Sequence, residues 1–411
     1  MTPYINPADL RGYSRMIIGA AGQVTDLVEE MHSTIAAPFS PVRAAAPGRT
    51  APGRPASGRT RGITGLVYRS IHGVYRLVDA GLDAVLGQVT PLLGDRPSAP
   101  ERETLLAILN GVLGDQLAAR DNPLAIEMSL RSGGQSLVLE KHALQAAIPH
   151  ASPKLLVLAH GLCMNDLQWS CDGHDHGAAL AADFDYTPVY LHYNSGLHIS
   201  TNGRQFADLL EALTREWPQP VEELVIVGYS MGGLVARSAC HYAALAGHTW
   251  RQHLRKLIFL GTPHHGSPLE RAGHWVDLAL EARPYTAPLR RLGMNRSAGI
   301  TDLRYGNLLD EDWAGLGRFA HRPDDRQPVP LPDDVCCYAI AATRGCGAGD
   351  LKEWLLGDGL VPLPSALGHH EDPTRHLAFP QSQQWVGYNM GHTDLLCRAD
   401  VYQKLKEWLA E

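Results

Sequence analysis

The sequence feature that most constrains the fold is a short apolar run, Leu224–Val227, that leads directly into the motif Gly-Tyr-Ser-Met-Gly at residues 228–232. Apolar residues then recur at helical spacing, at Leu234, Val235, Ala239 and Tyr242. A strand, a Gly-x-Ser-x-Gly turn and a helix, in that order, form the context in which a serine is held on a strained turn above a sheet. We therefore predict that Ser230 is such a serine. The alternative is a serine in an ordinary glycine-rich turn.

From about residue 122 onward, strand and helix patterns alternate. Segments 126–131 and 136–139 flank Ser-Gly-Gly-Gln and predict a hairpin. Further strands are predicted at 154–159, 188–193, 256–260, 335–342 and 383–388, and helices at about 177–183, across 206–213, after Ser230 and at 394–409. The alternation predicts an α/β fold, with a mostly parallel sheet, helices on both faces and ligands at the carboxyl ends of the strands. Residues 267–334 interrupt this pattern, and an insertion there is most simply a cap over that edge.

The N-terminal part of the chain has a different character. Residues 1–121 predict a helical extension, with helices at 4–35, 63–89 and 101–119. A segment rich in proline, glycine and arginine at 36–62 predicts a disordered linker, because it cannot bury enough apolar surface to offset its ordering entropy. The helices could dock on the domain 122–411, pair with a second copy or lie on a lipid surface. Their polar faces are not markedly basic, which favours docking or oligomer contact over the membrane.

Composition limits the class of protein. The 411 residues have room for one large domain with an extension, or for two domains, and the net charge of −7 gives no reason to expect nucleic-acid binding. The seven cysteines lack the spacing of a disulfide framework, so we expect mostly reduced thiols in a reducing compartment. Neither a signal peptide nor an apolar stretch long enough to span a membrane is recognised. The expected location is therefore cytoplasmic, with peripheral membrane association as an alternative.

Two side chains downstream of Ser230 are candidates for activating it. A serine hydroxyl becomes a good nucleophile only when a base takes its proton and a carboxylate orients that base. Asp358 lies between two glycines in a loop after the strand 335–342, and Asp350 is the alternative acid. His392 lies between the last predicted strand and the closing helix, whereas the other downstream histidines have no strand to position them; these are His369, His370 and His376. We predict Asp358 as the orienting acid and His392 as the base.

Attack on a carbonyl also requires hydrogen-bond donors for the oxyanion that forms. One backbone N–H should come from Met231, the residue after the serine. The other should come from the loop after the first parallel strand, where Gly161 permits a turn that aims the N–H of Leu162 inward.

Polar residues at other strand ends are candidates for substrate contact. Asn194 and His198 follow one predicted strand and His264 follows another, although loops that bond their own backbone would explain them equally well. The segment Cys171–His176 contains metal-type ligands, including Asp172, His174 and His176. A closed zinc site normally gathers ligands from separated segments, so we expect a substrate-pocket loop or a surface loop there, with a metal site as the alternative.

Five short motifs occur in the order found in a known superfamily. They are His160-Gly161-Leu162, Gly228–Gly233, Gly261–His264, Asp358–Pro362 and Gly391-His392. Together they resemble the serine esterases and lipases of the α/β-hydrolase superfamily, most of all the bacterial triacylglycerol-lipase group and the GPI-inositol-deacylase-like branch. The similarity covers about residues 122–411. That family usually has histidine before the serine, where this chain has Tyr229, which leaves the mechanism intact but the substrate class open.

The resemblance implies hydrolysis of carboxylic esters through an acyl-enzyme without a cofactor. The leucines and tryptophans of the predicted cap suggest a substrate with an apolar acyl group. A thioesterase, an acyltransferase or an amidase would share the same three side chains. A different class of function, a non-catalytic interaction protein that uses the N-terminal helices, is the remaining alternative.

Overall fold

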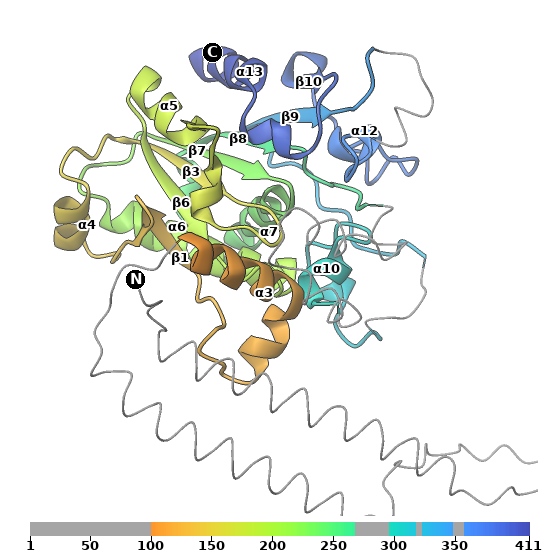
Figure 1. The fold of residues 1–411 in the computed structure, drawn as a ribbon, viewed down its shortest axis with the longest axis horizontal. Helices are drawn as coiled ribbons and strands as arrows, with labels where there is room; N and C mark the ends of the chain where they lie inside the picture. The colour runs from red at the N-terminus through yellow and green to blue at the C-terminus, as the bar shows by residue number, and fades with distance from the viewer. Residues whose placement is uncertain (1–99, 268–295, 318–322, 348–356) are drawn as a thin grey trace, which may run out of the picture. The chain divides into compact units, whose positions relative to one another are not determined.

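The computed structural model describes residues 100–267, 296–317, 323–347 and 357–411 (Figure 1). Several predictions lie outside these residues: the helices at 4–35 and 63–89, the linker 36–62, Asp350 and much of the insertion 267–334. Ser98–Arg120 and Ala125–Glu411 form one compact unit, and the description below concerns that unit.

An eight-stranded sheet runs through the unit in the order β10-β9-β8-β7-β3-β6-β1-β2. The pairings from β6 to β10 are parallel, and β1 pairs antiparallel with both β6 and β2. The predicted mostly parallel sheet is therefore confirmed, as is the hairpin, in a shorter form. The strands are β1 (Ser129–Ser132), β2 (Gln135–Ser136), β3 (Lys154–Ala159), β6 (Thr187–His192), β7 (Glu223–Tyr229), β8 (Leu254–Leu260), β9 (Cys336–Ala342) and β10 (Gln384–Gly387).

Helices cover the sheet on both sides (Figure 1). On one side, α5 (His176–Phe184) and α13 (Ala399–Ala410) contribute Leu180 and Leu405 to a core cluster that includes Leu158 and Val227 of the sheet. On the other side lie α6 (Ile199–Glu216) and α7 (Met231–Ala246), which pack against each other. The central strands are continuous apolar runs because both of their faces are buried. Two short helices, α4 (Lys141–Ala147) and α12 (Leu363–Ala366), complete these connections.

The helix α3 (Pro100–Ala119) belongs to the same compact unit as the sheet. Two of its glycines permit this packing: a Cβ at Gly111 would overlap the Cys163 sulfur, and one at Gly114 would overlap the Asn194 side chain. α3 thus lies against the loops that follow β3 and β6. The predicted helix at 101–119 is present, and of the three placements expected for the N-terminal helices its contacts with these loops correspond to docking on the domain 122–411.

The closing helix begins later than predicted. A 3₁₀ turn, η7 (Thr393–Leu396), comes first, and α13 starts only at Ala399. The Asp394 carboxylate accepts a hydrogen bond from the Gly391 N–H (2.7 Å), and Arg398 is extended, with φ −74° and ψ 134°. These local bonds form a separate turn where the apolar spacing alone predicted continuous helix.

The described part of the insertion lies against loops at the carboxyl end of the sheet. Its helix α10 (Ala298–Asp302) begins beside the loop after β6, where the Gly299 N–H donates to the Gly196 carbonyl (3.0 Å). Further along, Ser238 of α7 donates to the Leu308 carbonyl (2.7 Å), and Arg326 donates to the His264 carbonyl after β8 (2.9 Å). Residues 296–317 and 323–334 are therefore fixed to the edge where the predicted site residues lie.

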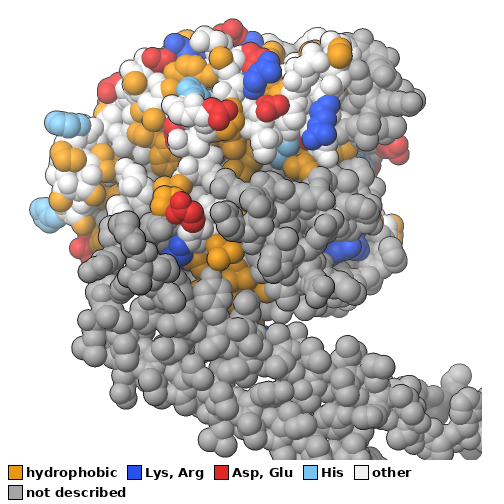
Figure 2. All heavy atoms as spheres, in the orientation of Figure 1, with side chains coloured by type: hydrophobic (Ala, Val, Ile, Leu, Met, Phe, Trp, Pro, Cys, Tyr) orange, Lys and Arg blue, Asp and Glu red, His pale blue; other side chains and the backbone are white. Residues whose placement is uncertain are grey.

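The surface carries charges of both signs. On the face drawn in Figure 2, acidic and basic side chains of the described residues are interspersed with apolar ones. Within the described ranges, no helix has the length and apolar character that crossing a membrane would require.

Candidate active site

Ser230 occupies a strained turn between β7 and α7. Its φ of 53° and ψ of −122° are unfavourable for a residue with a side chain, and the residue is 2% exposed. A Cβ at Gly228 would meet Gly233, and one at Gly232 would overlap the Ala159 carbonyl oxygen. Only glycines therefore allow β3, β7 and α7 to approach this closely at the turn. The Ser230 N–H donates to the Leu260 carbonyl (2.8 Å), which ties the turn to the end of β8.

Asp358 and His392 meet as a buried pair. The His392 Nδ1 lies 2.6 Å from an Asp358 carboxylate oxygen, and the two residues are 6% and 1% exposed, respectively. The other carboxylate oxygen accepts hydrogen bonds from the N–H groups of Leu360 (2.9 Å) and Val361 (2.8 Å). Since a carboxylate only accepts, the imidazole carries its hydrogen on Nδ1, and the neutral ring then presents Nε2 as an acceptor. Positive φ angles at Gly357 (53°) and Gly359 (99°) shape the loop that presents Asp358.

Packing brings the histidine and the serine turn to the same place in the fold. The rings of Tyr229 and His392 are 5.0 Å apart between centroids, and the Tyr229 hydroxyl donates to the His392 backbone carbonyl (3.2 Å). A Cβ at Gly261, just after β8, would lie 3.0 Å from the His392 ring. The histidine therefore lies over the ends of β7 and β8, beside the residue that precedes Ser230.

The loop after β3 passes on the other side of the serine. A Cβ at Gly161 would lie 3.1 Å from the Ser230 Cβ, so the peptide that carries the Leu162 N–H is a neighbour of Ser230. This loop is held by buried polar groups: Tyr193 donates to the His160 carbonyl (2.8 Å), and the Cys163 N–H donates to the Ser195 hydroxyl (3.1 Å). Burial lowers the pKa of His160 to about 3, so its ring stays neutral. Met231, the other predicted donor, is the first residue of α7 and is fully buried.

The three predicted substrate contacts lie in different environments. Asn194 is buried and donates to the Gly114 carbonyl (3.0 Å), and it also accepts from the Gly196 N–H (3.0 Å), so it joins α3 to the loop after β6. His264 is fully buried and accepts from Arg237 (3.3 Å), and burial together with Arg237 holds its pKa well below the usual range. As substrate contacts, Asn194 and His264 stay predictions.

His198 lines a cavity of about 270 Å³ formed largely by the described part of the insertion. Its ring stacks on Trp313, with centroids 3.7 Å apart, and its Nδ1 lies 3.0 Å from the Asp302 carboxylate. Burial raises the pKa of Asp302, and the bond from His198 opposes that rise.

Sequence reasoning missed Asp302, Trp313 and Arg326, which line the same cavity. The partners His198 and Asp302 are 104 residues apart, so no local pattern could have linked them.

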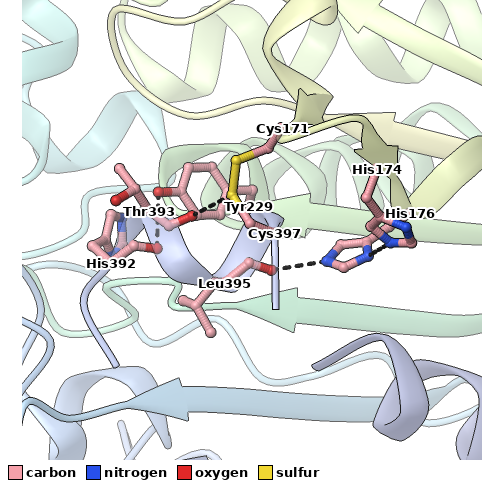
Figure 3. The surroundings of a disulfide bond; sticks show 8 residues. All are labelled: Cys171, His174, His176, Tyr229, His392, Thr393, Leu395 and Cys397. Atoms are coloured by element: carbon pink, nitrogen blue, oxygen red, sulfur yellow. Dashed lines mark hydrogen bonds between the residues drawn. A yellow bond between two sulfur atoms is a disulfide. The ribbon is translucent and has the colours of Figure 1, made fainter. Parts of the chain in front are cut away.

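The metal-type segment contains a disulfide-bonded cysteine and two histidines in hydrogen-bond contact. Cys171 forms a disulfide with Cys397, which corrects the expectation of reduced thiols for this pair (Figure 3). The His174 Nε2 lies 2.8 Å from the His176 Nδ1, and the His176 Nε2 lies 3.0 Å from the Leu395 carbonyl. A group formed by Cys171, Asp172 and Cys397 has close ligand atoms, but the two sulfurs are bonded to each other and offer no thiolate. The sequence could not reveal this pairing because 226 residues separate the two cysteines.

Comparisons with known proteins give a family of undetermined role and a set of structural relatives. A family profile described as "Domain of unknown function (DUF7379)" matches residues 135–303, which is less than half of the chain. No match was found among curated protein sequences. Among solved structures, the chain is similar to the mature lipase BlEst2 of Bacillus licheniformis, with 17% identity, coverage of 63% of this chain and 94% of the lipase, and a TM-score of 0.41.

Two further lipases are similar to the chain at lower sequence identity. Lipase 1 from Pelosinus fermentans is 13% identical, with coverage of 63% of this chain and 99% of that one and a TM-score of 0.41. The lipase of Staphylococcus hyicus is 11% identical, with coverage of 63% and 95% and a TM-score of 0.37. At these identities and scores the likeness assigns no activity to the chain. A functional conclusion must come from its own residues.

Proposed function

We propose that this chain is a serine hydrolase of the α/β-hydrolase fold that cleaves carboxylic esters through an acyl-enzyme. The observation that carries the proposal is the arrangement around Ser230. Ser230 occupies a strained turn at the carboxyl end of β7, directly after Tyr229, whose ring packs against His392 with centroids 5.0 Å apart. The His392 Nδ1 is in turn bonded to the buried Asp358 carboxylate at 2.6 Å. A solvated loop serine needs neither this backbone strain nor a buried imidazole–carboxylate pair beside it.

In the proposed reaction, the Ser230 hydroxyl oxygen attacks the ester carbonyl carbon while His392 Nε2 takes the hydroxyl proton. Asp358 keeps the imidazole in the required tautomer and stabilises its protonated form. The N–H groups of Leu162 and Met231 receive the oxyanion. When the intermediate collapses, the ester C–O bond breaks, and the leaving alcohol takes the proton from His392. Water then repeats the same steps on the acyl-enzyme, which releases the carboxylic acid and restores Ser230.

The insertion is the proposed cap over this site. Its described part is bonded to the loops after β6 and β8, at the carboxyl edge of the sheet. Trp313 and Leu316 contribute apolar surface to the cavity that His198 lines, which suits an apolar acyl group next to a polar one.

The Cys171–Cys397 disulfide favours an oxidising compartment over the cytoplasm.

The decisive experiment is labelling with a fluorophosphonate, which reacts only with an activated serine. The wild-type chain should be labelled and Ser230→Ala should not, with circular dichroism to verify that both are folded. A folded wild-type protein that stays unlabelled would instead favour the interaction protein. A panel of esters, thioesters and amides with matched acyl chains then separates the ester hydrolase from the thioesterase, the acyltransferase and the amidase.

A further inference from the structure

The turn that carries His392 has contacts besides the one with Asp358 that the proposed reaction does not use. The turn runs from Gly391 to Cys397, between β10 and α13, and contains η7. Asp358 holds the imidazole, but the backbone of the turn is held elsewhere. Figure 3 shows Cys397 of this turn bonded to Cys171 and the Leu395 carbonyl bonded to His176, while His392 lies beside Tyr229. Cys171 belongs to a hairpin that lies more than 200 residues earlier in the chain.

That hairpin consists of β4 (Ser170–Cys171) and β5 (His174–Asp175), and it leads directly into α5. The Cys171–Cys397 disulfide bonds its first strand covalently to the last residue of the turn. On its second strand, Asp175 accepts from the Tyr190 hydroxyl (2.7 Å) and from the Ala178 N–H (2.9 Å). The hairpin is thereby fixed to β6 and to α5, so it gives the turn a rigid support.

A chain of two imidazoles forms the second connection. The Leu395 carbonyl can only accept, so His176 must carry its hydrogen on Nε2 to make the 3.0 Å bond. The His176 Nδ1 is then an acceptor, and His174 donates to it from Nε2 at 2.8 Å. Burial lowers the pKa of His176 to about 4, so the ring stays neutral near neutral pH. His174 therefore donates to His176, and His176 donates to the Leu395 carbonyl. Tyr402 of α13 stacks on His176, with centroids 5.9 Å apart.

We propose that the β4–β5 hairpin, through the Cys171–Cys397 disulfide and the His174–His176–Leu395 bonds, is a positioning element that holds His392 in register with Asp358 and Ser230. The inference rests on the proposed function, since it gives the hairpin a role in the same reaction. None of its residues touches the reacting atoms; they act through the backbone of the turn. Catalytic groups must be held to within about 0.5 Å of the productive geometry, and a short loop without support does not provide that precision.

The test compares the full-length wild-type protein with three test variants and one control variant. His176→Phe keeps a ring of similar size but removes the donor to Leu395, whereas His176→Gln retains an N–H near the position of Nε2. The double variant Cys171→Ser/Cys397→Ser removes the covalent bond. Leu144→Ala is the matched control, because Leu144 is fully buried in α4 and its truncation lowers stability without touching the turn.

Two readouts apply to every form. The first is kcat and KM for a soluble ester, measured at the same interval below each variant's own melting temperature. The second is the proton resonance of the His392 Nδ1–H in protein labelled with ¹⁵N-histidine, assigned by its loss in Asp358→Asn. This resonance reports the imidazole–carboxylate bond whether or not the protein turns over an ester.

His176→Phe and the double serine variant should lose tenfold or more in kcat with KM little changed, and the resonance should broaden or disappear. His176→Gln should recover part of both signals, and Leu144→Ala should keep both. Retention of the resonance and of kcat within twofold in His176→Phe and the serine pair would overturn the inference, as would equal losses in Leu144→Ala. If the wild type is neither labelled at Ser230 nor active, the proposed function fails, and the resonance still decides whether the hairpin holds His392.

Discussion

At the scale of single residues, the candidate site depends on where hydrogens can lie. The Asp358 carboxylate already accepts two backbone N–H bonds on one oxygen, so the other oxygen is left for His392. Because a carboxylate oxygen only accepts, its bond with His392 selects the tautomer of the ring that carries hydrogen on Nδ1. The arrangement is therefore sensitive to a change that preserves shape but turns an acceptor into a donor.

Asp358→Asn makes that change. An amide that keeps its oxygen on the two backbone N–H groups turns its NH₂ toward the imidazole, which favours the tautomer of His392 with hydrogen on Nε2. We expect kcat for an ester to fall by about ten-thousand-fold near neutral pH with the fold retained, as measured by steady-state kinetics and circular dichroism. Asp350→Asn is the control and should stay within about twofold of the wild type. If Asp350→Asn were the inactive variant, the orienting acid would be the other aspartate.

The residues of the site differ in how far the sequence could predict them. Ser230, Asp358 and His392 each lie at a junction that periodicity and glycines mark locally, and the structure brings Asp358 and His392 into contact. The pairing of His198 with Asp302 and of Cys171 with Cys397 has no such mark, because it depends on which distant loops the sheet order brings together. Backbone periodicity predicts elements, whereas contacts between loops follow from the tertiary fold.

At the scale of elements, the placement of α3 shows which of the alternatives left open by the sequence applies to this helix. An apolar helix with glycines is equally compatible with docking on the sheet and with pairing to a second copy. Its packing shows in two close approaches: Gly111 faces Cys163, and Gly114 faces Asn194. The helix thus supports the loop after β3, from which the Leu162 N–H is proposed to come.

Gly114→Ala tests that support. Its new Cβ would overlap the Asn194 amide, so we expect the free energy of unfolding to fall by about 1–3 kcal/mol. Urea unfolding of Gly114→Ala, Asn194→Ala and the double variant measures the coupling, and the second substitution should recover part of the loss because it removes the overlapping group. Strictly additive losses would show that the two residues do not meet.

At the scale of the whole molecule, several buried histidines are kept neutral. Burial is the main cause that lowers the pKa of His160 and His265 to about 3 and that of His176 to about 4. In the unfolded chain these rings bind protons below about pH 6.5, while in the folded state they do so only at much lower pH. The unfolded state therefore holds more protons through this range, and stability falls as the pH falls.

We expect each such histidine to contribute a slope of about 1.4 kcal/mol per pH unit to the free energy of unfolding between its unfolded and folded pKa values. For His176 this window extends from about pH 6.5 down to about pH 4. His176→Phe should accordingly flatten the stability profile by one proton there, as measured by urea unfolding at a series of pH values. Parallel profiles for the two proteins would contradict a buried neutral His176.

The Cys171–Cys397 disulfide and the 226-residue stretch of chain that it spans form a covalent ring. The ring encloses Ser230, Asp358 and His392, so a protease that cuts any one peptide bond between the two cysteines would leave both fragments attached. Such nicked protein would migrate as one species on a non-reducing gel and separate only after reduction. When the cut lies between Ser230 and Cys397, a covalent label on the serine would remain joined to the fragment that carries the C-terminus until the disulfide is reduced.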